Sequence, residues 1–114
     1  MKFVANTVYH IISQSLWQDI KKLEYYSPDS LEKEGFIHLS NAAQVNSVVK
    51  RFYANLENLV LLEININKLK SPLKYEDVGT DGTFPHLYGM LNVNAVENVY
   101  PIFTKENGDV FWNR

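Results

Sequence analysis

Hydrophobic and polar residues follow patterns in the first part of the chain that predict two strands and a short helix. Residues 6–13 (NTVYHIIS) are rich in β-branched and aromatic side chains, which is typical of a strand. Leu16, Ile20 and Leu23 then recur at i, i+4 and i+7, and this spacing predicts a helix. A second strand is predicted over residues 36–40 (FIHLS), after a helical turn that a glycine ends.

The clearest helical pattern comes directly after this second strand. Apolar residues recur at i, i+3, i+4 and i+7 from Val45 to Phe52, which predicts an amphipathic helix. Asn41 and Gln44 stand three residues apart in front of it and resemble a capping box. We therefore expect the chain to turn from strand to helix at residues 41–44.

Strands dominate the prediction for the second half of the chain. Residues 59–66 (LVLLEINI) are almost continuously apolar, as in a buried central strand. Residues 79–85 (GTDGTFP) combine turn formers with glycine and proline and predict a mobile loop. The other predicted elements are strands over 73–78 and 86–91, a helical turn over 92–96, and a C-terminal hairpin over 97–112 that turns at Asn107 and Gly108.

This order of elements predicts an α+β fold with a mostly antiparallel or mixed sheet and short helices in the N-terminal half. The chain has 114 residues, the size of one domain, so we expect a single domain over residues 1–114. A chain of this length can bury one core without help from a metal or a disulfide.

Composition narrows the function classes. The net charge is −2, which argues against a dedicated nucleic-acid binder because such proteins usually carry a basic face. There are no cysteines, which excludes disulfides and thiolate metal sites. No apolar run approaches the roughly 18 residues of a membrane span, and the N-terminus lacks the apolar core of a signal peptide. We therefore expect a cytoplasmic protein that does not enter a membrane.

The three histidines all stand in apolar or aromatic surroundings: His10 in VYHII, His38 in FIHLS and His86 in FPHLYG. One interpretation is that each is a core histidine whose ring bonds to a backbone carbonyl. The other is that at least two of them line one pocket, because ring nitrogens need polar partners when they are buried. A zinc site of three histidines is disfavoured, since no two histidines have the spacing of a local ligand pair.

Other polar residues allow two interpretations as well. Arg51, on the predicted helix, is either a solvent-facing side chain or a clamp for an anion, a role that suits its five donors. Glu76 and Asp77 are adjacent, so on a strand they point to opposite faces and do not form a carboxylate pair. We interpret both as solvated.

Several segments together resemble a known family. VYHI, EGFIHLS, RFYA, LVLLEI and FPHLYG, over about residues 7–101, are similar to domain-of-unknown-function family 952. The resemblance implies a minimal ADP-ribosyltransferase-like fold, with two packed, mostly antiparallel sheets around an NAD-type cleft. The chain also resembles the catalytic half of the RNA 2′-phosphotransferases, which carry a YHGT-like first strand, a later VHLS and an arginine on the helix that follows.

The resemblance also implies roles for individual residues. His10 would bind the ribose of NAD, and His38 with Ser40 would line the nicotinamide side of the cleft. Arg51 falls at the position of the helix arginine. In this arrangement His38 and Ser40 share the cleft face of their strand with Phe36, and the residues between them enter the core.

The chain departs from the resembled pattern at three points. Ile11 stands where YHGT has the glycine that gives room for a ligand. The basic RNA-binding domain of the phosphotransferases is absent, in keeping with the net charge of −2. The catalytic glutamate of the protein-modifying transferases has no clear counterpart, and the corresponding late region offers His86 and Tyr88 instead. Transfer of ADP-ribose to protein is therefore disfavoured.

Two functions remain open at this point. The first is an enzyme that acts on NAD or another ribose phosphate, with catalytic residues His38, His86 and Tyr88 and ligand-binding residues His10, Ser40 and Arg51. The second is a non-catalytic module that binds a small molecule or nucleotide in the same cleft. NAD would be a substrate, and neither a metal nor a resident cofactor is expected. Nucleic acid is not expected as a partner, and the sequence leaves the oligomeric state open.

Overall fold

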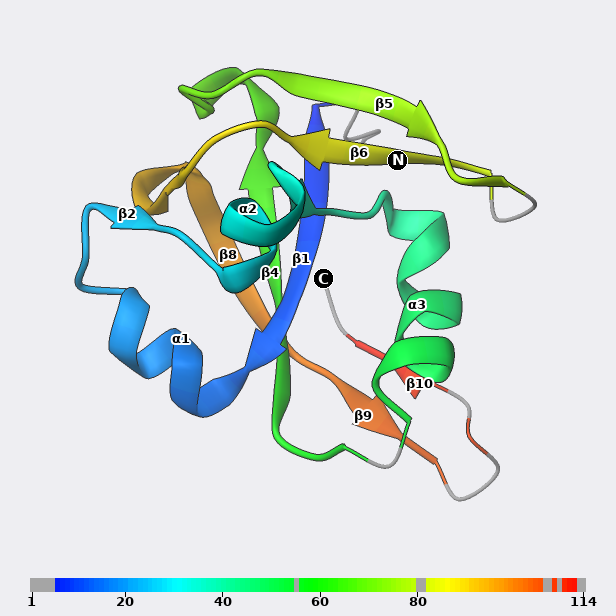
Figure 1. Ribbon diagram of the computed structural model, residues 1–114. Helices are drawn as coiled ribbons and strands as arrows, with labels where there is room; N and C mark the ends of the chain where they lie inside the picture. Colours follow the sequence, from blue (N-terminus) through cyan, green and yellow to red (C-terminus); the bar gives the residue numbers. More distant parts are fainter. Residues whose placement is uncertain (1–5, 55, 80–81, 106–107, 109, 113–114) are drawn as a thin grey trace.

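The computed structural model describes residues 6–54, 56–79, 82–105, 108 and 110–112, which form a mixed α+β fold (Figure 1). The strands are β1 (Thr7–Ser13), β2 (Tyr25–Tyr26), β3 (Ile37–His38), β4 (Leu59–Asn65), β5 (Leu73–Asp77), β6 (Thr83–Leu87), β7 (Leu91–Asn92), β8 (Val96–Pro101), β9 (Phe103–Thr104) and β10 (Val110–Phe111). The helices are α1 (Gln14–Ile20), α2 (Asp29–Glu34) and α3 (Val45–Phe52), with short 3₁₀ turns η1 (Ala42–Gln44), η2 (Ile66–Lys68) and η4 (Val93–Ala95).

Two three-stranded sheets form the framework, and every strand pair between described residues is antiparallel. The first sheet has the order β1-β4-β8 and the second has the order β3-β6-β5. A β-bridge joins them: the backbone N–H of Tyr9 donates to Ser40 O at 2.7 Å, and the N–H of Ser40 donates to Tyr9 O at 2.8 Å. The prediction of antiparallel sheets is confirmed, and two further two-stranded sheets, β2-β7 and β9-β10, accompany them.

Strand β4 is buried on both faces, which explains its continuously apolar sequence. Leu62 packs in a core cluster with Ile20 of α1 and Ile37 of β3. Leu61 points the other way, into a second cluster with Val45 and Val49 of α3. In Figure 1, α1 and α3 accordingly lie on opposite sides of the sheet that contains β1 and β4.

The capping box before α3 is confirmed. The side chain of Asn41 accepts from the backbone N–H of Gln44, and Gln44 Oε1 accepts from the N–H of Asn41, each at 3.0 Å. This pair starts η1, which continues into α3. The turn therefore fixes the direction in which α3 leaves β3.

The predicted loop over residues 79–85 is wrong at its C-terminal end, because Thr83, Phe84 and Pro85 belong to β6. Proline is rare in a central strand because it lacks an N–H. Here Pro85 still contributes its carbonyl, which accepts from the N–H of Leu39 at 3.1 Å. The N–H that proline lacks would face the carbonyl of Leu39, and β3 has already ended at His38, so no hydrogen bond within β3 is lost. The middle of the loop, residues 80–81, lies outside the described residues.

Two smaller predictions also need correction, and one strand was missed. The strand predicted over 86–91 is split between β6 and β7 by a turn in which Gly89 has φ +153° and a Cβ would lie 2.3 Å from Ser71 Oγ. The hairpin predicted over 97–112 is confined to β9 and β10, because β8 pairs with β4 instead. Asn107 of the predicted turn lies outside the described residues, whereas Gly108 has φ +91° and donates its N–H to Lys105 O at 2.9 Å. Strand β2 was not predicted, since two residues are too few to show a pattern.

No helix in the described ranges is long and apolar enough to cross a membrane.

The central strand gives a direct test of the fold. Leu62→Ala should lower the free energy of unfolding by about 2–5 kcal/mol, because Leu62 is fully buried and the truncation leaves a cavity. Leu23, which is 51% exposed, provides the matched control, and Leu23→Ala should change this free energy by about 0.5 kcal/mol or less. Urea unfolding of both variants measures the difference, and equal losses would contradict the assigned core.

Candidate functional site

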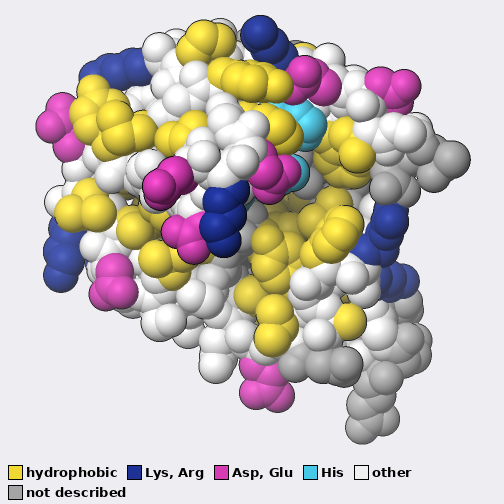
Figure 2. All heavy atoms as spheres, in the orientation of Figure 1, with side chains coloured by type: hydrophobic (Ala, Val, Ile, Leu, Met, Phe, Trp, Pro, Cys, Tyr) yellow, Lys and Arg dark blue, Asp and Glu magenta, His cyan; other side chains and the backbone are white. Residues whose placement is uncertain are grey.

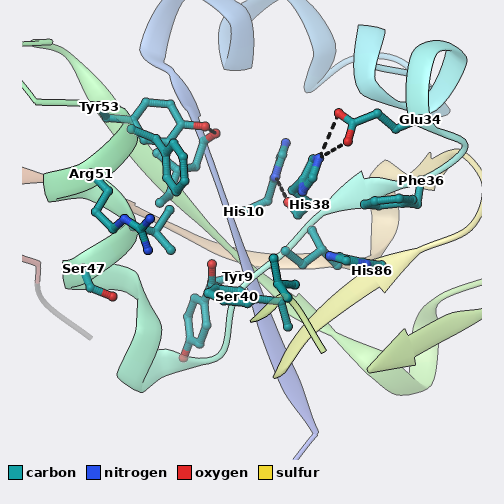
Figure 3. A pocket seen from close by; sticks show the side chains of 16 residues that line it. Tyr9, His10, Glu34, Phe36, His38, Ser40, Ser47, Arg51, Tyr53 and His86 are labelled. Carbon is teal, nitrogen blue, oxygen red and sulfur yellow. Dashed lines mark hydrogen bonds and ion pairs between the residues drawn. The ribbon is translucent and has the colours of Figure 1, made fainter. Parts of the chain in front are cut away.

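A pocket of about 650 Å³ opens along the outer edge of β1, between α3 on one side and the β3–β6 sheet on the other. Five of the six residues predicted for the site line it: His10, His38, Ser40, Arg51 and His86 (Figure 3). Most of its remaining wall is apolar or aromatic. In the surface view, histidine side chains reach the surface among hydrophobic side chains, and acidic side chains lie beside them (Figure 2).

His10 comes from β1 and has one bonded and one unbonded ring nitrogen. Its Nδ1 lies 2.9 Å from His38 O, and because a carbonyl only accepts, Nδ1 carries the proton and donates. Nε2 is then a lone-pair acceptor, and it is the one buried side-chain N or O atom without a partner in the described part of the chain. The ring as a whole is half-buried, whereas Nε2 itself is enclosed.

Burial also determines the charge of His10. It lowers the pKa of His10 to about 4, against the opposing effect of the bond to the His38 carbonyl, and the nearby His38 ring adds to the lowering. His10 is therefore neutral at physiological pH and presents an acceptor, not a cation.

His38 follows α2 and faces a carboxylate from that helix. Its Nε2 lies 3.1 Å from Glu34 Oε1 and 3.2 Å from Oε2 (Figure 3). Both side chains are about half exposed, at 55% and 49%. The pair is held by local geometry, because α2 ends at Gly35, whose φ of +88° turns the chain into β3.

His86 is the most enclosed histidine, with 6% of its surface exposed. It lies opposite His38 in the β3–β6 register, and the two rings meet edge-on with centroids 5.5 Å apart. Phe36 stacks on the His86 ring at 4.0 Å. On the far side, His86 Nδ1 lies 2.9 Å from Glu76 Oε1.

Tyr88 does not line the pocket, but its ring lies 5.4 Å from the ring of Phe36, which does. Its hydroxyl donates to Glu76 Oε1, the same oxygen that contacts His86. The hydrogen bond from Tyr88 contributes most to holding the pKa of Glu76 below its usual range, and the hydrogen bond with His86 adds to it. The bond between Tyr88 and Glu76 also raises the pKa of Tyr88. Glu76 is therefore a carboxylate that two neighbours fix in place.

Ser40 and Arg51 occupy opposite walls. Ser40 is buried, and its backbone forms the bridge to Tyr9, which places Ser40 beside β1. Arg51 is exposed on α3, with its guanidinium 5.3 Å from the centre of the Phe52 ring. Figure 3 shows the Arg51 side chain reaching towards the space in front of His10.

Sequence reasoning missed the two carboxylates that orient the histidines. Glu76 is not simply solvated, since it bonds to both His86 and Tyr88. The signal lies in the pairing of β5 with β6, which places Glu76 opposite Phe84 and diagonal to His86. That register depends on a strand boundary the sequence did not reveal. Glu34 could have been found from its i, i+4 spacing to His38.

Comparisons with known proteins place the chain in a family. The family model described as "Protein of unknown function (DUF952)" matches residues 11–99. The chain belongs to this family. The family description names no reaction, and a search of the curated proteins found no match.

Solved structures of one protein share the fold of this chain. The crystal structure of protein CC0527 from Caulobacter crescentus has a TM-score of 0.79 and 30% identity, and the match covers 92% of this chain and 93% of that one. A double-mutant crystal form gives the same TM-score at 29% identity, with the same coverage. The solution NMR structure of CC0527 gives 0.76 at 30% identity, covering 91% and 90%.

The lowered pKa of His10 predicts acid-sensitive folding. Between pH 6.5 and 4 the unfolded chain binds a proton at His10 that the folded chain does not, so acid favours unfolding in this window. Above about pH 7 the effect vanishes. His10→Asn retains a donor for His38 O and removes the titration, so wild type should lose up to about 3 kcal/mol relative to this variant from pH 7 to 4. Urea unfolding at several pH values measures this loss, and parallel pH profiles would contradict the buried neutral ring.

Tyr88 gives a second pH test at the site. Tyr88→Phe removes the hydrogen bond that contributes most to the lowered pKa of Glu76, so this pKa should rise towards its ordinary value. NMR titration of the Glu76 side-chain carboxyl carbon measures it. Tyr25→Phe, at an exposed tyrosine on β2, is the matched control and should leave the titration of Glu76 unchanged. A Glu76 titration that is the same in wild type and Tyr88→Phe would contradict the assigned bond.

Proposed function

We propose that this pocket binds a ribose phosphate of the NAD type, and that the protein is an enzyme acting at the ribose. The observation that carries the proposal is that His10, a neutral side chain of the pocket lining, has a buried Nε2 acceptor without a hydrogen-bond partner. The two three-stranded sheets beside this pocket are in keeping with a minimal ADP-ribosyltransferase-like fold, which the proposal includes.

His10 needs a ligand that donates a hydrogen bond. A buried acceptor without a partner costs about 1–3 kcal/mol, which a donor from a ligand would recover. Nε2 is enclosed in the free protein, so the side chains that cover it must move aside before a ribose hydroxyl can donate to it. Because Nδ1 already donates to the His38 carbonyl, the ring cannot reorient to satisfy Nε2 from within the protein without losing that bond.

The edge of β1 offers a second polar contact beside His10. In an antiparallel strand, residues i and i+2 direct their N–H and C=O groups to the same side. Tyr9 directs both groups towards Ser40, so Ile11 directs its own towards the pocket, where Ile11 O accepts from the Tyr53 hydroxyl at 3.4 Å. An amide group on a flat ring, such as that of nicotinamide, matches a donor and an acceptor on one strand edge.

The rest of the wall suits the remaining parts of such a ligand. Phe36, Phe52 and Phe84 supply aromatic surface for a base. Arg51, on the opposite wall from His10, suits a phosphate, because its guanidinium can bind two oxygens at once. A volume of about 650 Å³ falls in the range of small-molecule sites, roughly 300–1,000 Å³.

A second function rests on a different observation. Ile11 fills the position where a glycine gives a ligand room. Of the carboxylates in the described ranges, only Glu34 lines the pocket, and it already contacts His38. These features favour a binding module that holds a nucleotide without turnover. Binding of NAD without release of nicotinamide would select this function over the enzyme.

Ligand binding can be measured before any reaction is sought. Thermal unfolding with NAD, ADP-ribose and nicotinamide should show stabilisation, by about 2.7 kcal/mol at 100 times the dissociation constant. Calorimetric titration of the same ligands gives that constant. No stabilisation by any of the three would contradict the proposed ligand class.

Two variants with matched controls test the contacts. His10→Asn keeps the donor to His38 O but loses the Nε2 acceptor, so it should weaken NAD and ADP-ribose binding about tenfold or more. Arg51→Gln should weaken the phosphate-bearing ligands and not nicotinamide. Lys50→Gln removes a charge from the neighbouring position of α3, which does not line the pocket, and should have little effect. Equal losses in Arg51→Gln and Lys50→Gln would contradict the assigned phosphate contact.

A further inference from the structure

His86 has the geometry of an oriented base. A carboxylate only accepts, so His86 Nδ1, at 2.9 Å from Glu76 Oε1, carries the proton. The other nitrogen, Nε2, is then the acceptor. Of the buried side-chain N and O atoms in the described residues, His10 Nε2 is the only one without a partner, so His86 Nε2 must reach accessible surface, and His86 lines the pocket.

Phe36 and Glu76 contact the His86 ring directly and hold it in this orientation. Phe36 stacks on one face of the ring, with the ring planes 21° apart. Glu76 is itself fixed by the Tyr88 hydroxyl, and the ammonium of Lys74 lies 4.9 Å from the centre of the Tyr88 ring. A histidine between a fixed carboxylate and a pocket has the arrangement used for proton transfer, in which the carboxylate sets the tautomer.

We propose that His86 is the base that deprotonates the nucleophile attacking the ribose of the pocket ligand, and that Glu76 is its positioning residue. This inference rests on the proposed function. It also supplies a carboxylate-linked base, because among the described residues after Glu34 no carboxylate lines the pocket. Glu76 acts there through the imidazole of His86.

NAD and water are the reactants of this step. Water attacks C1′ of the nicotinamide-bearing ribose, and its proton passes to His86 Nε2 as the C1′–O bond forms. The C1′–N bond breaks, and its electron pair moves into the pyridinium ring, so nicotinamide leaves neutral. The proton then passes from His86 to solvent. The products are ADP-ribose, nicotinamide and one proton, and the step needs a base but no acid for the leaving group.

The test measures nicotinamide release from NAD and NAD-induced stabilisation on the same full-length preparations. His86→Asn keeps a donor to Glu76 and removes Nε2, so it should lower kcat about 100-fold or more while binding changes less than about twofold. Glu76→Gln should lower kcat about tenfold or more with binding retained. Glu97→Gln is the matched control, since Glu97 is also hydrogen-bonded on a strand but pairs with Lys68 outside the pocket, and it should leave both readouts unchanged.

An NMR measurement tests the geometry without turnover. The ¹⁵N shifts of His86 should show the Nδ1–H tautomer in wild type and a loss of this preference in Glu76→Gln. A wild-type Nε2–H tautomer would overturn the proposal whatever the substrate.

The kinetic outcomes distinguish the role of His86 as a base from the binding of NAD in the pocket. Stabilisation by NAD without nicotinamide release, or a His86→Asn variant with wild-type kcat, would overturn the base and leave the binding site standing. Absence of NAD binding in wild type would overturn the proposed function and the inference with it.

Discussion

The arrangement of the site depends on one pair of backbone hydrogen bonds, between Tyr9 and Ser40. These bonds, at 2.7 and 2.8 Å, join the edge of the central sheet to the chain that follows β3. The adjacent residue, His10, is thereby brought within 2.9 Å of His38 O. Because the bridge is a single residue pair, the two strands diverge beyond it, and the edge of β1 is left facing a pocket instead of a fourth strand.

The three histidines show how a folded chain fixes proton positions. Each gives one ring nitrogen to an acceptor of a different kind: a backbone carbonyl for His10, a helix carboxylate for His38 and a strand carboxylate for His86. An acceptor-only partner determines which nitrogen bears hydrogen in the neutral ring, so the second nitrogen of that ring is an acceptor. Preorganisation of this kind is what a binding or catalytic surface needs before its ligand arrives.

The sequence predicted the parts of this structure whose signals are local. The apolar run of β4, the spacing of Val45 to Phe52 and the capping pair Asn41–Gln44 each describe an element that neighbouring residues specify. The gathering of His10, His38 and Arg51 at one pocket followed from strand alternation and from a resemblance to a family. The role of Glu76 could not be predicted, because it depends on the register of β5 against β6 and on a strand that contains Pro85. The proline and two glycines of residues 79–85 predict a loop as long as the strands that pair with this segment are unknown.

Pro85 affects how the chain passes from one three-stranded sheet to the other. Since it offers no N–H, the carbonyl of Leu39 has no partner in the β3–β6 ladder, and the chain is released from one sheet just where Ser40 joins the other. The segment from His38 to Ser40 therefore pairs first with one sheet and then with the other. Residues 38–40 thus link the sheet that carries His86 to the strand that carries His10, so both histidines are attached to one continuous stretch of backbone.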